Sequence, residues 1–405
     1  CTTIAELGFG AGTSFLLAWA AWRAHAANDA RAQLDWVSVE GIPLDAATLR
    51  AAALADPAMR DLAPFADALA AAWPARIPGI HRRAFDGGRV RLTLLFGGPG
   101  DVLPALPFAA DAWNLDGFSP SRNPEMWDDA AIAQVAAHAH AGTTVATWCA
   151  AAAVRDRLSA AGFDVEARPG AAGKREMTVA RRRADAPPPA RGTVRALPAW
   201  FAPAGQAGAG HAVAAPHAAP RSAIVVGAGL AGAAAARALA ERGMRVTVLD
   251  ARGAAGGASA APRAVLAPHL ASWASPQTRV VAHAFLHARA VMERIGAPLE
   301  PHGLLHPFAT DDEWGWEQAI ADWGWPDELL RTVDPADAAR AAGIPLGPPA
   351  DPVPAVHVPL AAATCPASTV RALLDHASID VVAPAPVERL THDEHGWTAS
   401  TARHG

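Results

Sequence analysis

An acidic residue followed by glycine and aromatic residues marks the stretch from Asp111 to Trp127, which reads Asp-Ala-Trp-Asn-Leu-Asp-Gly-Phe-Ser-Pro-Ser-Arg-Asn-Pro-Glu-Met-Trp. An apolar run that stops at such punctuation is typical of a strand in a parallel sheet. Ligands of open α/β sheets bind beyond the carboxyl ends of the strands, so we predict that Asp116 lies at the mouth of a site. A carboxylate there could accept the proton of an amine. The plainer interpretation is a surface turn whose aspartate caps the next helix.

A glycine-rich turn upstream supports the first interpretation. Residues 2–6 are predicted as a strand, a helix is predicted from about Thr13, and a second strand at 34–39 closes with an acid. This order is that of a nucleotide-type site, in which glycines let the backbone approach the ligand and the acid binds ribose hydroxyls. The predicted cofactor-binding residues are Glu6, Gly8, Gly10, Gly12 and Glu40. The turn resembles the first motif of class I methyltransferases, whose ligand is S-adenosylmethionine.

The remaining elements of this half continue the α/β pattern. Helical segments are predicted at 44–72, 130–140 and 151–161, a hairpin-like strand pair at 82–96, strands at 111–116 and 142–149, and a closing antiparallel pair at 163–168 and 176–180. In the loop 97–101, Asp101 follows a strand where such folds offer a polar contact to adenine. A helix N-cap before Val102 is the alternative for Asp101.

The residues that could meet a substrate are an aromatic side chain and a basic stretch. Phe118 could pack against a base, because unstacked RNA bases are commonly held on aromatic faces. Lys174 and Arg175 open a basic stretch that continues with residues 181–183. It is either a rim that contacts phosphates or a solvated strand end at the start of a linker.

A second nucleotide-type unit begins at Ala223, after a stretch rich in proline, alanine and glycine (185–220) that we predict to be a linker. A strand leads into Gly227, Gly229 and Gly232, and then a helix to Arg242 and a strand at 245–249 precede Asp250, 23 positions after Gly227. Every part of the dinucleotide fingerprint is present, with the pyrophosphate predicted at the helix N-terminus and Asp250 on the ribose.

The loop that follows Asp250 favours FAD over NAD. Residues 252–259 contain a Gly-Ala-Ser sequence ending at Ser259, and in FAD-dependent amine oxidases such a loop wraps the pyrophosphate and ribityl region. Gly257 and Ser259 therefore join the predicted cofactor-binding residues. Helices are predicted at 276–295 and 368–376 and a strand at 379–382. The tryptophan-rich stretch 314–325 either lines a substrate site or packs in a core.

Composition limits the class of protein. A chain of 405 residues predicts two or three domains, and 51% hydrophobic with 18% charged residues is globular composition. The net charge of -5 gives no global nucleic-acid signature, so any RNA contact would be local. Cys1, Cys149 and Cys365 have neither metal-ligand nor disulfide spacing, which favours a reducing cytoplasm. No apolar run reaches the roughly 18 residues that span a membrane. The chain starts at a cysteine inside a predicted strand and ends without a capping signal, so we expect a fragment lacking both ends.

Taken together, these parts are similar to the bifunctional enzymes that complete 5-methylaminomethyl-2-thiouridine at the tRNA wobble position. That family carries Glu-x-Gly-Phe-Gly-x-Gly (here 6–12), Asp-x-Trp-x-Leu-Asp-Gly-Phe-x-Pro with Asn-Pro-Glu-Met-Trp (111–127), and Ala-Gly-Phe-Asp-Val with Gly-Lys-Arg-Glu-Met (161–165 and 173–177). The resemblance covers essentially the whole chain. Two departures lie in the second half: Ala260-Ala261 where the family usually has asparagine, and residues 360–364 in place of a Gly-Gly-Trp segment.

The resemblance implies a class I (Rossmann-like) S-adenosylmethionine methyltransferase domain at 1–184, a linker at 185–220, and an incomplete FAD-binding Rossmann domain of the amine-oxidase (DAO) type at 221–405. It implies that the FAD half removes a carboxymethyl group from the modified uridine and that the other half methylates the resulting amine, with Asp116 as catalytic residue and Phe118, Lys174 and Arg175 on the substrate. The expected partner is tRNA, with no membrane and no metal, and the protein is expected to be a cytoplasmic monomer. The alternatives are a methyltransferase fused to an FAD oxidase of a small amine, and a methyltransferase with a degenerate flavin domain kept for binding.

Overall fold

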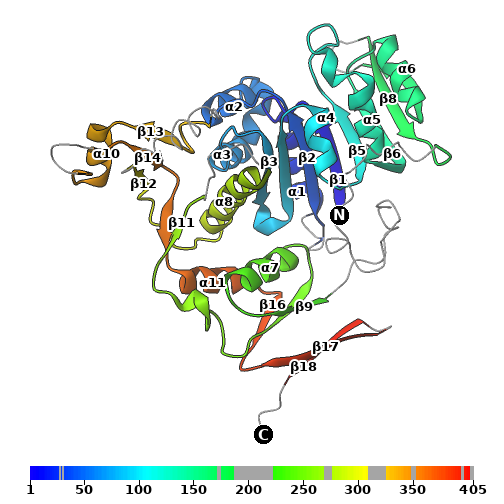
Figure 1. The fold of residues 1–405 in the computed structure, drawn as a ribbon. Coiled ribbons are helices and arrows are strands. Elements are labelled where there is room, and N and C mark those ends of the chain that lie inside the picture. Colours follow the sequence, from blue (N-terminus) through cyan, green and yellow to red (C-terminus); the bar gives the residue numbers. More distant parts are fainter. Residues whose placement is uncertain are drawn as a thin grey trace. The chain divides into compact units, whose positions relative to one another are not determined.

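The computed structural model describes residues 1–26, 29, 32–170, 175–186, 222–268, 276–308, 325–347, 353–393 and 396–401. The chain forms two compact units, Cys1–Ala219 (unit 1) and Pro220–Gly405 (unit 2) (Figure 1). The predicted linker lies outside the described residues except for Asp185 and Ala186. Each unit has its own sheet and its own core.

Unit 1 is built on an eight-stranded sheet with the order β3-β4-β2-β1-β5-β6-β8-β7. Its strands are β1 (Thr2–Leu7), β2 (Leu34–Glu40), β3 (Gly79–Phe85), β4 (Val90–Phe96), β5 (Ala110–Leu115), β6 (Ala139–Thr147), β7 (Phe163–Pro169) and β8 (Glu176–Arg182). The five strands from β4 to β6 in this order are parallel, and β3, β8 and β7 pair antiparallel at the two sides. The chain runs from β1 to β2 and β4 on one side and later to β5 and β6 on the other. The strand order therefore reverses between β1 and β5, the place where doubly wound sheets bind ligands.

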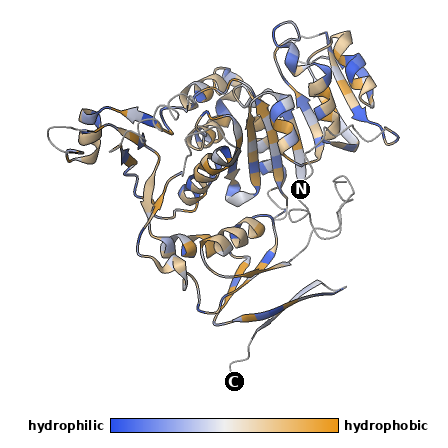
Figure 2. Cartoon of the chain, viewed as in Figure 1, coloured by the Kyte–Doolittle hydropathy of each residue, from blue (hydrophilic) through white to orange (hydrophobic). Residues whose placement is uncertain are grey.

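Helices cover both faces of this sheet (Figure 1). On one face lie α1 (Thr13–His25), α2 (Ala46–Ala53) and α3 (Ala63–Ala71), and on the other α4 (Pro99–Val102), α5 (Asp129–Ala137) and α6 (Ala152–Ala160). Trp19 is a large buried side chain of the first core, and Trp113 of the second. Figure 2 shows hydrophobic residues along the strands and helices that face these cores. Alternate residues of β1, β2 and β5 thus point to different helix layers.

The predicted boundary between the helix at 130–140 and the next strand is wrong, and β3 begins at Gly79 rather than at residue 82. The helix predicted to reach residue 140 ends at Ala137, and β6 begins at Ala139 rather than at residue 142. His138 ends the helix because its ring nitrogens lie 2.9 Å from the carbonyl oxygen of Gln134 and 3.1 Å from that of Leu106. The chain then pairs with β5 at once. The closing antiparallel pair is confirmed by β7 and β8.

Among the described residues, unit 2 contains a parallel three-stranded sheet with the order β16-β10-β9, an antiparallel three-stranded sheet with the order β12-β14-β13, and the antiparallel pairs β11-β15 and β17-β18. The parallel strands are β9 (Ser222–Val226), β10 (Arg245–Leu249) and β16 (Ile379–Val382). The antiparallel strands are β11 (Ala264–Leu266), β12 (Leu304–Pro307), β13 (Arg331–Val333), β14 (Ala355–Val358), β15 (Ala362–Thr364), β17 (Val387–Asp393) and β18 (Gly396–Thr401). The helices described are α7 (Leu230–Ala240), α8 (Pro276–Arg294), α10 (Pro335–Ala342) and α11 (Pro366–Leu374). The predicted strand, helix and strand of the second glycine unit are therefore present, with α7 packed on β9 and β10.

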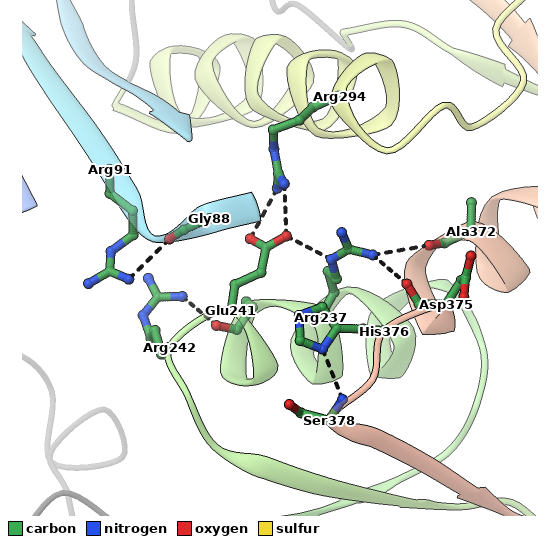
Figure 3. Close-up of polar contacts among 11 residues, drawn as sticks. Gly88, Arg91, Arg237, Glu241, Arg242, Arg294, Ala372, Asp375, His376 and Ser378 are labelled. Carbon is green, nitrogen blue, oxygen red and sulfur yellow. Dashed lines mark hydrogen bonds and ion pairs between the residues drawn. The ribbon is translucent and has the colours of Figure 1, made fainter. Parts of the chain in front are cut away.

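A partly buried ionic cluster joins three helices of unit 2 (Figure 3). Arg237 of α7 and Arg294 of α8 both donate to Glu241, at 2.7 Å and 2.8 Å. Arg237 also donates to the backbone carbonyl oxygen of Asp375, just after α11, at 3.0 Å. Burial raises the pKa of the Glu241 carboxyl, but the two guanidinium groups outweigh burial and the net pKa is lowered. Because removing one partner would leave a partly buried charge without its ion pair, this cluster stabilises the contact of α7 with α8 and with the residue after α11.

None of the helices that the structure describes is both long and apolar enough to cross a membrane. The three cysteines form no disulfide bond.

Candidate functional site

In unit 1 the turn after β1 and the end of β5 meet closely. The backbone N–H of Asp116 donates to the carbonyl oxygen of Leu7 at 2.9 Å, which extends the β1–β5 ladder one residue past β5. Gly8 has φ +91°, and a Cβ added there would lie 2.9 Å from the backbone oxygen of Asp116. Only glycine satisfies both constraints without strain. The structure thus brings Gly8 and Asp116 together at the point where the strand order reverses.

Glu40, at the end of β2, holds the same glycine turn from the other side. Its carboxylate accepts hydrogen bonds from the backbone N–H of Gly10 at 2.8 Å and from that of Ile42 at 2.8 Å. Gly12 is the left-handed N-cap residue of α1, with φ +75°. Glu40 remains partly exposed, and each carboxylate oxygen has a further lone pair. Glu40 can therefore shape the turn and still accept a ribose hydroxyl.

Glu6 differs from the other predicted cofactor residues because it is buried. Its side chain is 1% exposed, and its carboxyl accepts hydrogen bonds from the Trp36 indole at 3.1 Å, the Ser38 hydroxyl at 2.8 Å and the Asn114 amide at 3.2 Å. Burial raises the pKa of Glu6 to about 8, although these donors lower it. The carboxyl of Glu6 therefore lies beneath the glycine turn rather than on its surface.

Asp116 is exposed and does not cap a described helix, so the plainer interpretation of it as a helix cap is wrong. Asp128 caps α5 instead, by accepting from the backbone N–H of Ala131. Phe118 is 67% exposed, and its carbonyl oxygen accepts a hydrogen bond from the Trp127 indole at 2.7 Å, which anchors the loop. An exposed carboxylate and an exposed aromatic ring two residues apart thus lie on one anchored loop.

Asp101 lies in the first turn of α4, and Gly98 is the N-cap residue of that helix, so the alternative that Asp101 caps a helix is wrong. This helix follows β4, which neighbours β2, and the Gly97 N–H donates to the Glu40 carbonyl oxygen at 3.0 Å. Arg175 is exposed and precedes β8, whose Thr178 pairs with Thr147 at the carboxyl end of β6. Both residues therefore lie along the same edge of the sheet as Asp116. Lys174 lies outside the described residues.

Two residues near this site, Asn114 and Ser14, were not predicted from the sequence. Asn114 donates from its amide nitrogen to Glu6 and to the Ser14 hydroxyl of α1 at 3.1 Å. The signal for Asn114 was available, since it lies two residues before Asp116 in a strand and must share its face. Ser14 is found only once the packing of α1 on the sheet is known.

In unit 2 the three fingerprint glycines allow a close approach between strand and helix. A Cβ added to Gly232 in α7 would lie 1.9 Å from the carbonyl oxygen of Gly227, and Gly227 itself has φ +102°. The N-cap residue of α7 is Gly229, where an added Cβ would lie 3.2 Å from the Ser259 hydroxyl. That hydroxyl accepts from the backbone N–H of Leu230 at 3.1 Å. Ser259 therefore lies against the N-terminus of α7, where a phosphate would bind.

Asp250 holds the second glycine turn. Its carboxylate accepts from the backbone N–H groups of Ala228 at 2.7 Å, Arg252 at 2.7 Å and Gly253 at 2.9 Å. Burial raises the pKa of Asp250, but these donors outweigh burial and the net pKa is lowered. Gly257 follows in the same loop, where an added Cβ would lie 3.1 Å from the Arg252 guanidinium.

Both sites have the form that their expected cofactors need. In each unit a glycine turn lies so close to neighbouring backbone that an added Cβ would collide with it. An acid at or just after the end of the next strand accepts a hydrogen bond from a backbone N–H of that turn. Such turns admit an adenosine ribose or a pyrophosphate at close range. Of the two family departures, Ala260 closes the short 3-10 helix η7 (Ala258–Ala260), and Ala361 is buried beside β15. Trp314, Trp316 and Trp323 lie outside the described residues.

Comparison with known proteins separates the two units in the same way. A family model described as S-adenosyl-L-methionine-dependent methyltransferase matches residues 60–183. A second, described as FAD dependent oxidoreductase, matches residues 222–405. The chain therefore combines a methyltransferase domain with an FAD-dependent oxidoreductase domain.

Curated relatives combine the same two parts. The chain is similar to proteins named tRNA 5-methylaminomethyl-2-thiouridine biosynthesis bifunctional protein MnmC. It is 39% identical to that of Ralstonia nicotianae over 85% of this chain and 50% of the relative. It is 37% identical to those of Ectopseudomonas mendocina, over 97% of this chain and 56% of the relative, and Hahella chejuensis, over 98% and 59%. The chain thus spans little more than half the length of these relatives.

Proposed function

We propose that this chain, which belongs to the family of bifunctional tRNA 5-methylaminomethyl-2-thiouridine biosynthesis proteins, modifies the wobble uridine of tRNA with both of its units. The observation that carries the proposal is the identity of 37–39% to these relatives, which extends over 85–98% of this chain. Unit 2 would remove the carboxymethyl group from 5-carboxymethylaminomethyl-2-thiouridine. Unit 1 would methylate the resulting 5-aminomethyl-2-thiouridine. The substrate would be a modified tRNA in the cytoplasm.

For unit 1 the cofactor is S-adenosylmethionine, which supplies an electrophilic methyl group when bound. Gly8, Gly10 and Gly12 would let it approach the backbone, and Glu40 would accept its ribose hydroxyls. Asp101, after the neighbouring strand β4, would offer a polar contact to its adenine. These residues all lie at the carboxyl ends of β1, β2 and β4.

Asp116 would hold and deprotonate the substrate amine. Methyl transfer needs an uncharged nitrogen in line with the methyl group, so positioning carries much of the rate. Asp116 is exposed, follows β5 directly, and is fixed through its backbone to Leu7. Its carboxylate can accept a hydrogen bond from the amine and then its proton. The exposed ring of Phe118 would pack against the uracil.

Contact with tRNA would be local, because the chain as a whole carries a net charge of -5. Arg122, in the loop after β5, and Arg175, before β8, are both exposed along the edge that holds Asp116. Arginines placed around a site could neutralise phosphates of a bound RNA loop. Lys174 would add to them.

For unit 2 the cofactor is FAD, which supplies the oxidation of a carbon–nitrogen bond when bound. Asp250 would accept the adenosine ribose, and the N-terminus of α7 beside Ser259 would hold the pyrophosphate. Gly257, where an added Cβ would lie 3.1 Å from the Arg252 guanidinium, would let the intervening loop stay close to the cofactor.

The test uses two tRNA substrates and reads the wobble nucleoside by mass. With tRNA bearing 5-aminomethyl-2-thiouridine and S-adenosylmethionine, we expect a gain of one methyl group. With tRNA bearing the carboxymethylaminomethyl form, the FAD-loaded protein of full family length should yield the aminomethyl product without the methyl donor and the methylaminomethyl product with it.

The outcomes separate the candidates. Conversion of the aminomethyl tRNA alone would support unit 1 and contradict oxidation by unit 2. No change in either tRNA, together with oxidation of free amines, would replace the tRNA substrate by a small amine.

A further inference from the structure

A row of polar side chains crosses the sheet of unit 1 directly beneath the proposed methyltransferase site. Glu6 of β1 pairs in register with Ser38 of β2 on one side and with Asn114 of β5 on the other. Two residues further along the three strands stand Gly8, Glu40 and Asp116. Side chains two residues apart lie on the same face of a strand, so the polar row of Glu6, Ser38 and Asn114 lies next to the row of Gly8, Glu40 and Asp116 that forms the site.

The hydrogen bonds of the polar row connect every element that shapes the site. The Glu6 carboxyl accepts hydrogen bonds from the Ser38 hydroxyl at 2.8 Å and from the Asn114 amide at 3.2 Å. The Asn114 amide also donates to the Ser14 hydroxyl at 3.1 Å. Ser14 is the second residue of α1, which follows the glycine turn. β1, β2, β5 and α1 are thus joined through one carboxyl group.

Unit 2 demonstrates that a glycine turn does not need such a carboxyl group. Val225 stands two residues before Gly227, and Val248 stands two residues before Asp250. They pair in register, as Glu6 pairs with Ser38 in unit 1. Burying a carboxyl group costs free energy unless it is well paired, so a carboxyl at this depth calls for another role than shaping the turn.

Two carboxylates stand in the row above Glu6, those of Glu40 and Asp116, and the charge of Asp116 acts on Glu6. β2 presents Trp36 and Ser38, α1 acts through Ser14, and β5 presents Asn114, none of which is ionisable. Burial is the main cause that raises the pKa of Glu6 to about 8, and the charge of Asp116 raises it by a smaller amount. Such an interaction is mutual, because each of two carboxylates disfavours the charge of the other.

We propose that Glu6 is a positioning residue for methyl transfer: as a neutral acid it ties the site together, and when it loses its proton it makes Asp116 a stronger base. This inference rests on the proposed function of Asp116. It requires that Glu6 and Asp116 titrate as a coupled pair. It also requires that this coupling vanish when either carboxyl is replaced.

The first test needs no activity. Infrared spectra of the chain between pH 6 and pH 10 should show the band of one protonated carboxyl disappear with a midpoint near pH 8. Glu6→Gln should lack that band, and Asp116→Asn should move its midpoint down by about 0.5 to 1 pH unit, since a like charge is removed. A midpoint unchanged in Asp116→Asn, or a band that survives in Glu6→Gln, would overturn the proposal.

The glutamine variant should fold, because the network can reverse. If the Asn114 amide turns over, its oxygen can accept from the new glutamine while Trp36 and Ser38 still donate to the glutamine oxygen. Asp86→Asn is the matched control. Asp86 binds Arg23 and Trp19 beside β3 and β4, at the opposite end of the sheet, and its replacement should leave the band unchanged.

The second test is the pH dependence of methyl transfer at saturating donor. The ratio of the wild-type rate to the Glu6→Gln rate should rise about two- to five-fold between pH 6.5 and pH 9, as expected for a stronger base. The ratio for Asp86→Asn should stay flat. A flat ratio for Glu6→Gln would contradict the proposal, whereas absence of transfer by the wild-type protein would contradict the proposed function and leave the infrared test decisive for the coupling.

Discussion

In unit 1 the carboxylate of Glu40, at the end of the second strand, accepts a hydrogen bond from the backbone N–H of Gly10. In unit 2 the carboxylate of Asp250 accepts one from the backbone N–H of Ala228. Beneath these similar hydrogen bonds the two units differ. Unit 1 has the pair Glu6 and Ser38 where unit 2 has Val225 and Val248. Glycines and one acid are therefore sufficient for a nucleotide-type turn, and the polar layer of unit 1 is an addition that points to proton chemistry rather than to cofactor binding.

The largest expected effect tests whether both turns depend equally on close backbone approach. Gly232→Ala places a Cβ 1.9 Å from the Gly227 carbonyl oxygen, and Gly8→Ala places one 2.9 Å from that of Asp116. We expect Gly232→Ala to lower FAD affinity by at least about 100-fold and Gly8→Ala to abolish most S-adenosylmethionine binding, since glycine is needed for the approach. Calorimetric titration with each cofactor measures both.

Gly100→Ala is the control, because a Cβ there meets nothing within 4 Å. Its cofactor affinities should equal those of the wild type. If Gly232→Ala bound FAD normally, the tight helix–strand approach in unit 2 would not be a cofactor site.

The second prediction compares the hydrogen bonds that Asp250 and Glu40 accept from the two glycine turns. Asp250 accepts three backbone N–H groups and Glu40 accepts two. Asp250→Asn should therefore lower FAD affinity more, by about 10- to 100-fold, than Glu40→Gln lowers S-adenosylmethionine affinity, because an amide NH₂ must face a backbone donor. Equal losses of cofactor affinity, or a larger loss in Glu40→Gln, would mean that these hydrogen bonds do not hold the turns in place.

The third prediction concerns stability and tests the polar layer. Burial raises the pKa of Glu6 from its ordinary value of 4.5 to about 8 in the folded state, so the folded state binds more protons than the unfolded state between these two pH values. Its contribution to the free energy of unfolding is complete below pH 4.5 and is lost as the pH rises through 8. The contribution is on the order of a few kcal/mol, which corresponds to about 5–15 °C in Tm.

Thermal unfolding at pH 5.5 and pH 9 checks it. The fall in Tm between these values should be smaller in Glu6→Gln than in the wild type and unchanged in Asp86→Asn. Equal slopes in wild type and Glu6→Gln would show that Glu6 is ionised throughout this range.

The strands, the glycine turns and the acids that hold these turns could be predicted from the sequence because each is a local pattern. β2 ends at Glu40 and β10 ends just before Asp250, as the apolar runs indicated. The methyltransferase and FAD-dependent oxidoreductase domains, and with them the two cofactor classes, also followed from short motifs.

The layer beneath the site could not be predicted in the same way. That Glu6 meets Asn114 depends on the register of two strands that are neighbours in space but far apart in the chain. The early end of α5 depends on the ring of His138, which reaches the distant Leu106. Such contacts are set by tertiary packing, which no local pattern contains.

The most direct measurement is the single-turnover rate of methyl transfer to aminomethyl tRNA by the wild type and by Asp116→Asn, with S-adenosylmethionine affinity measured on the same samples. Asp116 is fixed through its backbone, which contacts the glycine turn and which Asp116→Asn leaves in place. The account therefore predicts a rate lowered by at least about 100-fold with an unchanged affinity for S-adenosylmethionine. A parallel loss of affinity and rate would make Asp116 a cofactor or folding residue and contradict its role as the base.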